Sequence, residues 1–121
     1  MKEIVQDDAL YQNASRDPFT FNTIHLTKDV IRINISYGGG CADHEFSLIA
    51  SSFMESEPVQ VNVVLSHEDH DDPCDMWITQ EEVFNLVPLK RAWQQAYHNI
   101  SGTIVMNIEG YTDTILYHFS V

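Results

Sequence analysis

The chain has 121 residues, a length that fits one domain with a single modest core. Its 18 acidic residues against 6 Lys and Arg give a formal net charge of −12, which argues against binding to nucleic acid or to an anionic membrane surface, because both depend on basic side chains. The hydrophobic fraction of 44% is too high for a disordered chain, and the sequence contains no apolar run of about 18 residues, so we expect a globular protein without a membrane-spanning segment.

The first 28 residues show no sustained hydrophobic period, and Pro18 interrupts them. We therefore expect an irregular lead-in over 1–28, with a short edge strand at 19–26, followed by a single β domain over 29–121. The N-terminus lacks the apolar core of a signal peptide. The protein is then either cytoplasmic or an exported protein whose signal has been removed.

The middle of the chain reads as a series of short strands. Segment 29–37 alternates, with three isoleucines and Tyr37 on one face, as in a strand that buries one side. Three glycines end it, and further strands are predicted at 44–50, at the β-branched stretch 59–66, and from 76 to 79.

The remaining sequence predicts one helix and a hairpin. A helix near 88–97 begins at Pro88, which lacks an N–H where none is needed, and places Leu89 and Trp93 on one face. Strands at 103–110 and 114–121 are joined by a turn at Gly110. Six to seven short strands and one short helix indicate a mainly β fold, either an antiparallel β-sandwich or an open barrel.

Strand pairing predicts that both cysteines and two histidines meet at one end of the sheet. If 44–50 forms an antiparallel hairpin with 59–66, position 50 lies near 59, and if 59–66 then pairs with 75–79, the flanking residues converge. The residues brought together are Cys41, His44, His67 and Cys74.

Three interpretations of this cluster remain open. Cys41 and Cys74 can form a disulfide if their Cα atoms lie within about 7 Å, and such a staple requires an oxidising compartment but no cofactor. Alternatively, two thiolates and two imidazoles match a tetrahedral Zn²⁺ site, although the spacing is unorthodox. The two thiols can also be reduced and without a role. Neighbouring carboxylates would orient the histidines by accepting hydrogen bonds from them; they belong to Asp43, Glu45, Glu68, Asp69, Asp71, Asp72 and Asp75.

A thiol-dependent enzyme is a further alternative, because Cys41 with His44, or Cys74 with His67, could form a nucleophile–base pair. However, no recognised catalytic signature surrounds either cysteine, and the sequence contains no phosphate-binding loop. We therefore predict a non-enzymatic binding or accessory domain with an unidentified protein or small-molecule partner.

Four stretches, "GGGCADHEFSL", "PVQVNVVLSHEDHDDPCDMWIT", "LKRAWQQAY" and "GTIVMNIEGYTDTILYHF", resemble a family of small uncharacterised bacterial proteins, many of them predicted lipoproteins of the cell envelope. The resemblance covers about residues 30–121. It implies a location in the bacterial cell envelope or periplasm and a shared Cys/His constellation, but no activity. This chain departs from the pattern in lacking a lipobox-type signal. The matching positions are Gly39, Gly40, Cys41, His44, Phe46, Leu48, Leu65, His67, Asp72, Cys74, Tyr117 and Phe119.

Overall fold

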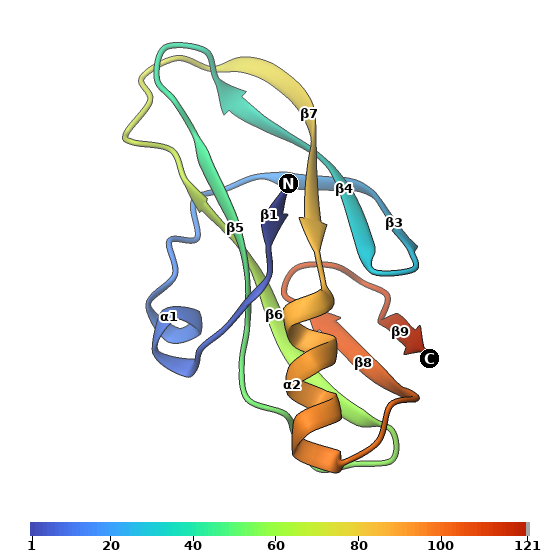
Figure 1. Cartoon of the computed structure of the whole chain (residues 1–121). Coiled ribbons are helices and arrows are strands. Elements are labelled where there is room, and N and C mark those ends of the chain that lie inside the picture. Colours follow the sequence, from blue (N-terminus) through green and yellow to red (C-terminus); the bar gives the residue numbers. More distant parts are fainter. Residues whose placement is uncertain (121) are drawn as a thin grey trace.

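The computed structural model describes residues 1–120. Within them the chain forms two helices and nine strands, and the strands build two sheets (Figure 1). None of the described helices has the length and apolarity needed to cross a bilayer. The elements are β1 (Lys2–Glu3), β2 (Val5–Gln6), α1 (Asp8–Asn13), β3 (Thr20–Thr27), β4 (Val30–Gly39), β5 (Glu45–Ala50), β6 (Val59–Glu68), β7 (Met76–Asn85), α2 (Val87–Tyr97), β8 (Gly102–Ile108) and β9 (Ile115–Phe119).

The two sheets bury one hydrophobic core. One has the strand order β1-β7-β4-β3, and the other has the order β2-β5-β6-β8-β9. The alternation predicted for 29–37 is confirmed, since the three isoleucines of β4 are fully buried and Tyr37 is 5% exposed. Alternate residues of β6 and β8 supply the opposite side of the core. The prediction of a mainly β, sandwich-like protein is therefore confirmed.

Strand pairing differs from the prediction in the register of β5 and β6 and in the partner of β7. β5 and β6 are antiparallel as expected, but Ala50 lies opposite Val63 rather than near Val59. The expected pairing of β6 with 75–79 is wrong, because β7 belongs to the other sheet and pairs with β4 over its whole length. The loop between Glu68 and Met76 carries the chain from one sheet to the other. Sequence alone does not show whether β7 pairs with the free edge of β4 or with that of β6.

The predicted helix and final hairpin are both present. α2 buries Leu89 and Trp93, and its C-cap residue is His98, whose φ is 52°. This helix lies between β7 and β8 in the chain and allows β8 to pair in parallel with β6, a departure from a purely antiparallel arrangement. β8 and β9 form the expected antiparallel pair, with Gly110 at φ +85° in the turn; Val121, placed in the last predicted strand, lies outside the described residues.

The segment 1–28 contains regular structure rather than an irregular lead-in. β1 joins β7 and β2 joins β5, both in parallel, so the N-terminus contributes to both sheets. α1 is capped at its N-terminus by Asp7, whose side chain accepts a hydrogen bond from the N–H of Leu10. The expected edge strand is β3. The pairing of β1 and β2 depends on free edges elsewhere in the chain, and no local periodicity reveals such edges.

Candidate functional site

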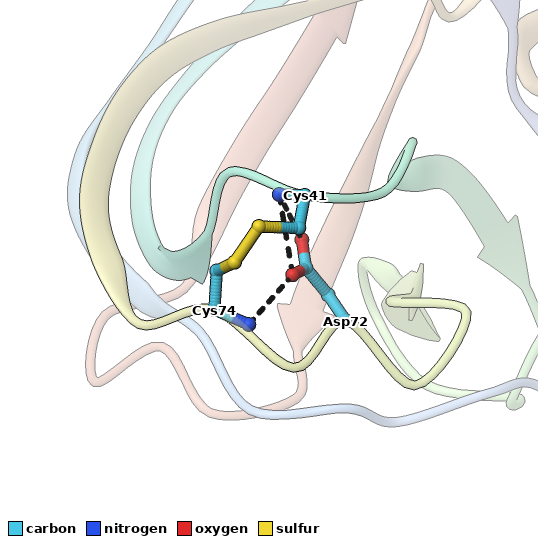
Figure 2. A group of neighbouring side chains, drawn as sticks. All are labelled: Cys41, Asp72 and Cys74. Carbon is cyan, nitrogen blue, oxygen red and sulfur yellow. Dashed lines mark hydrogen bonds between the residues drawn. A yellow bond between two sulfur atoms is a disulfide. The ribbon is translucent and has the colours of Figure 1, made fainter.

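A disulfide joins Cys41 and Cys74, with a Cα–Cα distance of 5.7 Å (Figure 2). The ladder between β4 and β7 explains why these residues meet. Gly39 lies opposite Met76, and each cysteine lies two residues beyond this pair, so the antiparallel register continues to the disulfide. Opposite residues in such a ladder are about 4.5–5.5 Å apart, close to the spacing that a disulfide requires. The disulfide interpretation is therefore the one found in the structure, although the strand that pairs with β7 is β4 and not β6.

The carboxylate of Asp72 lies between the two cysteine-bearing loops and holds them together (Figure 2). It accepts the backbone N–H of Gly40 at 3.0 Å and that of Cys74 at 2.9 Å, and it also accepts the N–H groups of Cys41 and Ala42. A carboxylate that accepts so many donors is stabilised in its charged form. Together with the hydrogen bond from His44, which is the largest cause, these contacts hold the pKa of Asp72 well below its usual range.

His44 and His67 extend this contact into the core. His44 Nε2 lies 2.8 Å from Asp72 Oδ2, His44 Nδ1 lies 2.7 Å from His67 Nε2, and His67 Nδ1 lies 3.2 Å from the carbonyl oxygen of Asp17. The side chain of His44 is 2% exposed, and the residue His67 is 1% exposed. The two imidazoles thus form a continuous chain of contacts from the carboxylate of Asp72 to the carbonyl group of Asp17.

The chain of contacts sets how many protons the two imidazoles need if all three contacts are to be hydrogen bonds. Each of the three contacts is a hydrogen bond only if one proton lies between its two atoms. The groups at the two ends of the chain of contacts, the carboxylate of Asp72 and the carbonyl oxygen of Asp17, can only accept a proton. Two neutral imidazoles carry two N–H protons in total. All three bonds therefore form only when the pair carries a third proton and a charge of +1.

Aromatic rings surround the two imidazoles. Phe46 stacks on His67 with ring centroids 4.4 Å apart and an interplanar angle of 10°, and Tyr37 lies 4.4 Å from the ring of His44. Phe19 packs edge-on against His67. Burial lowers the pKa of His67, with a further contribution from the neighbouring His44, so a second additional proton is disfavoured.

The disulfide end of the molecule has a strongly negative surface, which we call the acidic rim and define as residues 40–46 and 66–76. Its only basic side chains are histidines, because these two segments contain no Lys or Arg. His70 Nδ1 contacts the carbonyl oxygen of Asp43 at 2.5 Å, and this bond raises the pKa of His70. The acidic residues of the rim are Asp43, Glu45, Glu68, Asp69, Asp71, Asp72 and Asp75.

The structure brings the four predicted zinc ligands to one end but does not aim them at one point. The two sulfurs are bonded to each other, so they are not thiolates, and the imidazole nitrogens face each other, Asp72 and Asp17. Among the described residues, the donor groups that come within 4.8 Å of one another are Cys41 with Asp72 and Cys74, and Asp17 with Glu68 and Asp69. A zinc site in the reduced chain stays a prediction.

Sequence reasoning found both cysteines, both histidines and the acidic neighbours, but it missed how they are connected. Asp72 was expected only to orient histidines, whereas it also accepts four backbone N–H groups. The carbonyl group of Asp17 and the ring of Phe19 come from the segment before β3 and carry no motif. The spacing of Asp72 two residues before Cys74, followed by Pro73, is the one local indication of a turn that its carboxylate caps.

No family model matches the chain, and no curated protein sequence matches it. Three solved structures share its fold. A NigD-like immunity protein from Bacteroides caccae has a TM-score of 0.66 at 16% identity over 95% of this chain. A putative toxin-related protein from Parabacteroides distasonis has a TM-score of 0.54 at 12% identity over 98% of this chain. A DUF1344 protein of unknown function from Bacteroides vulgatus has a TM-score of 0.56 at 8% identity over 99% of this chain.

This chain spans 57%, 61% and 56% of those three proteins, respectively. At identities this low, the similarity concerns the arrangement of the backbone. It relates the two-sheet fold of this chain to folds found in Bacteroides and Parabacteroides proteins.

Proposed function

We propose that this chain is a non-enzymatic, protein-binding domain of the bacterial cell envelope, and that its acidic rim docks a basic protein partner. In this proposal the disulfide and the Asp72–His44–His67 chain are structural. They keep the rim in one conformation so that its carboxylates are arranged before the partner arrives, which lowers the entropy lost on binding.

One observation carries the non-enzymatic part of the proposal: every group with catalytic potential in the cluster is already engaged. Both sulfurs are in the disulfide, and the two imidazoles and the carboxylate of Asp72 bond to one another. The side chains of His44 and Asp72 are at most 2% exposed. A nucleophile or general base must reach its substrate, and these groups face inward.

The acidic charge supports a basic protein partner, and the disulfide supports a location outside the cytoplasm. A net charge of −12 favours association with a basic surface and accelerates the encounter. The fold is shared with a protein described as a NigD-like immunity protein, which agrees with a non-enzymatic accessory role. The disulfide and the resemblance to predicted envelope lipoproteins favour an oxidising location outside the cytoplasm.

Cross-linking in an envelope extract of the source organism tests the proposal. The rim variant carries Glu45→Lys and Asp75→Lys, at two exposed positions whose side chains make no hydrogen bond or ion pair among the described residues. The matched control carries Glu3→Lys and Glu57→Lys, which produce the same change of net charge. These two residues lie near the ends of β7 and β6 that are farthest from the acidic rim.

We expect wild type and control to capture the same basic protein, and the rim variant to bind the purified partner at least about tenfold more weakly. Binding of the wild type should also weaken between 50 and 300 mM salt, conditions at which screening of exposed charges increases. Equal losses in both variants, or affinity that salt leaves unchanged, would show that the rim does not dock the partner.

Thiol titration of the protein taken directly from cells separates this proposal from zinc binding by Cys41, His44, His67 and Cys74. A disulfide gives no reactive thiol until a reductant is added. Bound zinc gives about one metal per chain and thiols that react after chelation. The carboxylate of Asp72 lies within 4.8 Å of both sulfurs, so the reduced protein is also worth testing for bound metal.

A further inference from the structure

The central strand β6 lacks a hydrogen-bonding neighbour at one position. Its edge toward β8 is paired up to Val63, whose carbonyl group accepts the N–H of Glu109. The same edge is paired again at His67, which bonds to Ser15 and Asp17 from the segment before β3. Because successive residues of a strand point their polar groups to alternate sides, the residue between these contacts that faces the same edge is Leu65.

The position opposite Leu65 is open because β8 ends there. Gly110, at φ +85°, turns the chain away, and Tyr111 donates its N–H back to Ile108. Among the described residues, the N–H and C=O of Leu65 have no hydrogen-bond partner. Leu65 is 1% exposed, and unpaired backbone groups at such a buried residue are rare in folded proteins.

A pocket of about 640 Å³ lies at this gap, and Leu65 is part of its lining. Three aromatic side chains, those of Phe19, Phe21 and Tyr111, form one wall, with Phe21 packed against the other two at ring-centroid distances of 4.8 and 5.5 Å. An ion pair between Arg16 Nε and Glu109 Oε2, at 2.7 Å, joins the two chain segments that border the gap.

We propose that this pocket is an anchor site for an extended segment of a protein partner, which places one apolar side chain against the aromatic wall and the peptide group of that residue against Leu65. A free N–H and a free C=O at strand spacing are the pattern that a peptide completes when it joins a sheet. The aromatic wall supplies apolar contact of the kind found at the centre of protein interfaces.

The charges around the pocket favour a peptide over an ionic ligand. The charge of Arg16 is neutralised by Glu109, so it is not free to bind an anion, and the net charge of −12 repels anions at longer range. The inference rests on the proposed protein-binding function for the identity of the partner. The pocket itself can be tested without that partner.

Titration of the isotope-labelled full chain with N-acetyl-L-phenylalanine amide, followed by amide NMR, tests the pocket. This probe carries one aromatic side chain and two amide groups. We expect saturable shifts of the Leu65, Gly110 and Tyr111 amides with a dissociation constant of about 1 mM, a value typical of the affinity that so few atoms provide. Acetamide, which lacks the ring, should give no saturable shift at equal concentration.

Thr112→Trp and Thr114→Trp form a matched pair of variants in the same exposed loop. Thr112 lines the pocket, and Thr114 does not. We expect Thr112→Trp to weaken probe binding at least about tenfold by filling the pocket, and Thr114→Trp to bind as the wild type does. Equal binding by both variants, or shifts located elsewhere, would overturn the inference.

Hydrogen exchange of the unmodified protein gives a second measurement that needs no variant. The Leu65 amide should exchange at least about tenfold faster than those of Val63 and His67, because it lacks an acceptor. Equal protection of all three amides would contradict an open position in the sheet. These outcomes are independent of the rim: loss of probe binding leaves the charge-dependent docking standing, and a failed rim test leaves the pocket standing.

Discussion

Removal of the Cys41–Cys74 disulfide should lower the thermal stability by an amount that its loop length determines. The bond closes a loop with a sequence separation of 33. The chain-entropy relation then gives about 3.7 kcal/mol at 25 °C. A chain of 121 residues has an unfolding entropy of about 0.25 kcal/mol/K, so the expected decrease in Tm is about 15 °C.

Circular dichroism melts of the wild type with and without a reductant, and of the double variant Cys41→Ala and Cys74→Ala, measure this decrease. The ladder between β4 and β7 should hold the two loops near each other without the bond, so the reduced protein should still fold at 25 °C. A decrease below about 5 °C would refute the cross-link argument. A decrease above about 25 °C would show that the bond also maintains the backbone contacts of Asp72, a role that loop entropy does not include.

Three further predictions concern the buried network and the core. Asp72→Asn should lower Tm clearly more than the exposed Asp71→Asn in the same loop, since an amide nitrogen would face backbone donors. Burial lowers the pKa of His67 below about 6.5, its value in the unfolded chain, so the unfolded chain binds the proton more readily and Tm should fall from pH 6.5 to 5. In His67→Phe this part of the pH dependence should disappear. An unchanged pH profile in that variant would contradict the assignment of the pH dependence to His67. Gly102→Ala should cost about 1–3 kcal/mol in urea unfolding, because its Cβ would lie under 3.0 Å from the buried tryptophan of α2, whereas Gly38→Ala, with its nearest neighbour at 3.8 Å, should cost well under half as much.

Much of the secondary structure follows from local patterns. Alternation identified β4, β-branched composition identified β6, and Pro88 with apolar residues at helical spacing identified α2. These signals are local because each element must bury one face, and its period is fixed by backbone geometry. The very short strands β1 and β2 carry no such signal, because two residues cannot show a period.

The candidate site was found for a reason that was only partly correct. The sequence indicated that two cysteines and two histidines converge, and the structure confirms that they lie at one end. The strand that brings Cys74 there is a neighbour of β4, not of β6. Both arrangements satisfy the same alternation, so only the choice between two sheets distinguishes them.

The sequence by itself determined a negatively charged, mainly β domain with one helix and a Cys/His cluster, because composition and period are properties of the chain alone. Tertiary structure decided the state of that cluster. Asp72 engages the amides around Cys41 across a separation of about 30 residues, and residues 15–17 bond to the edge of β6 at His67, about 50 residues further along the chain. Such contacts depend on which strands become neighbours, and that choice is made by packing of the whole core rather than by any single segment.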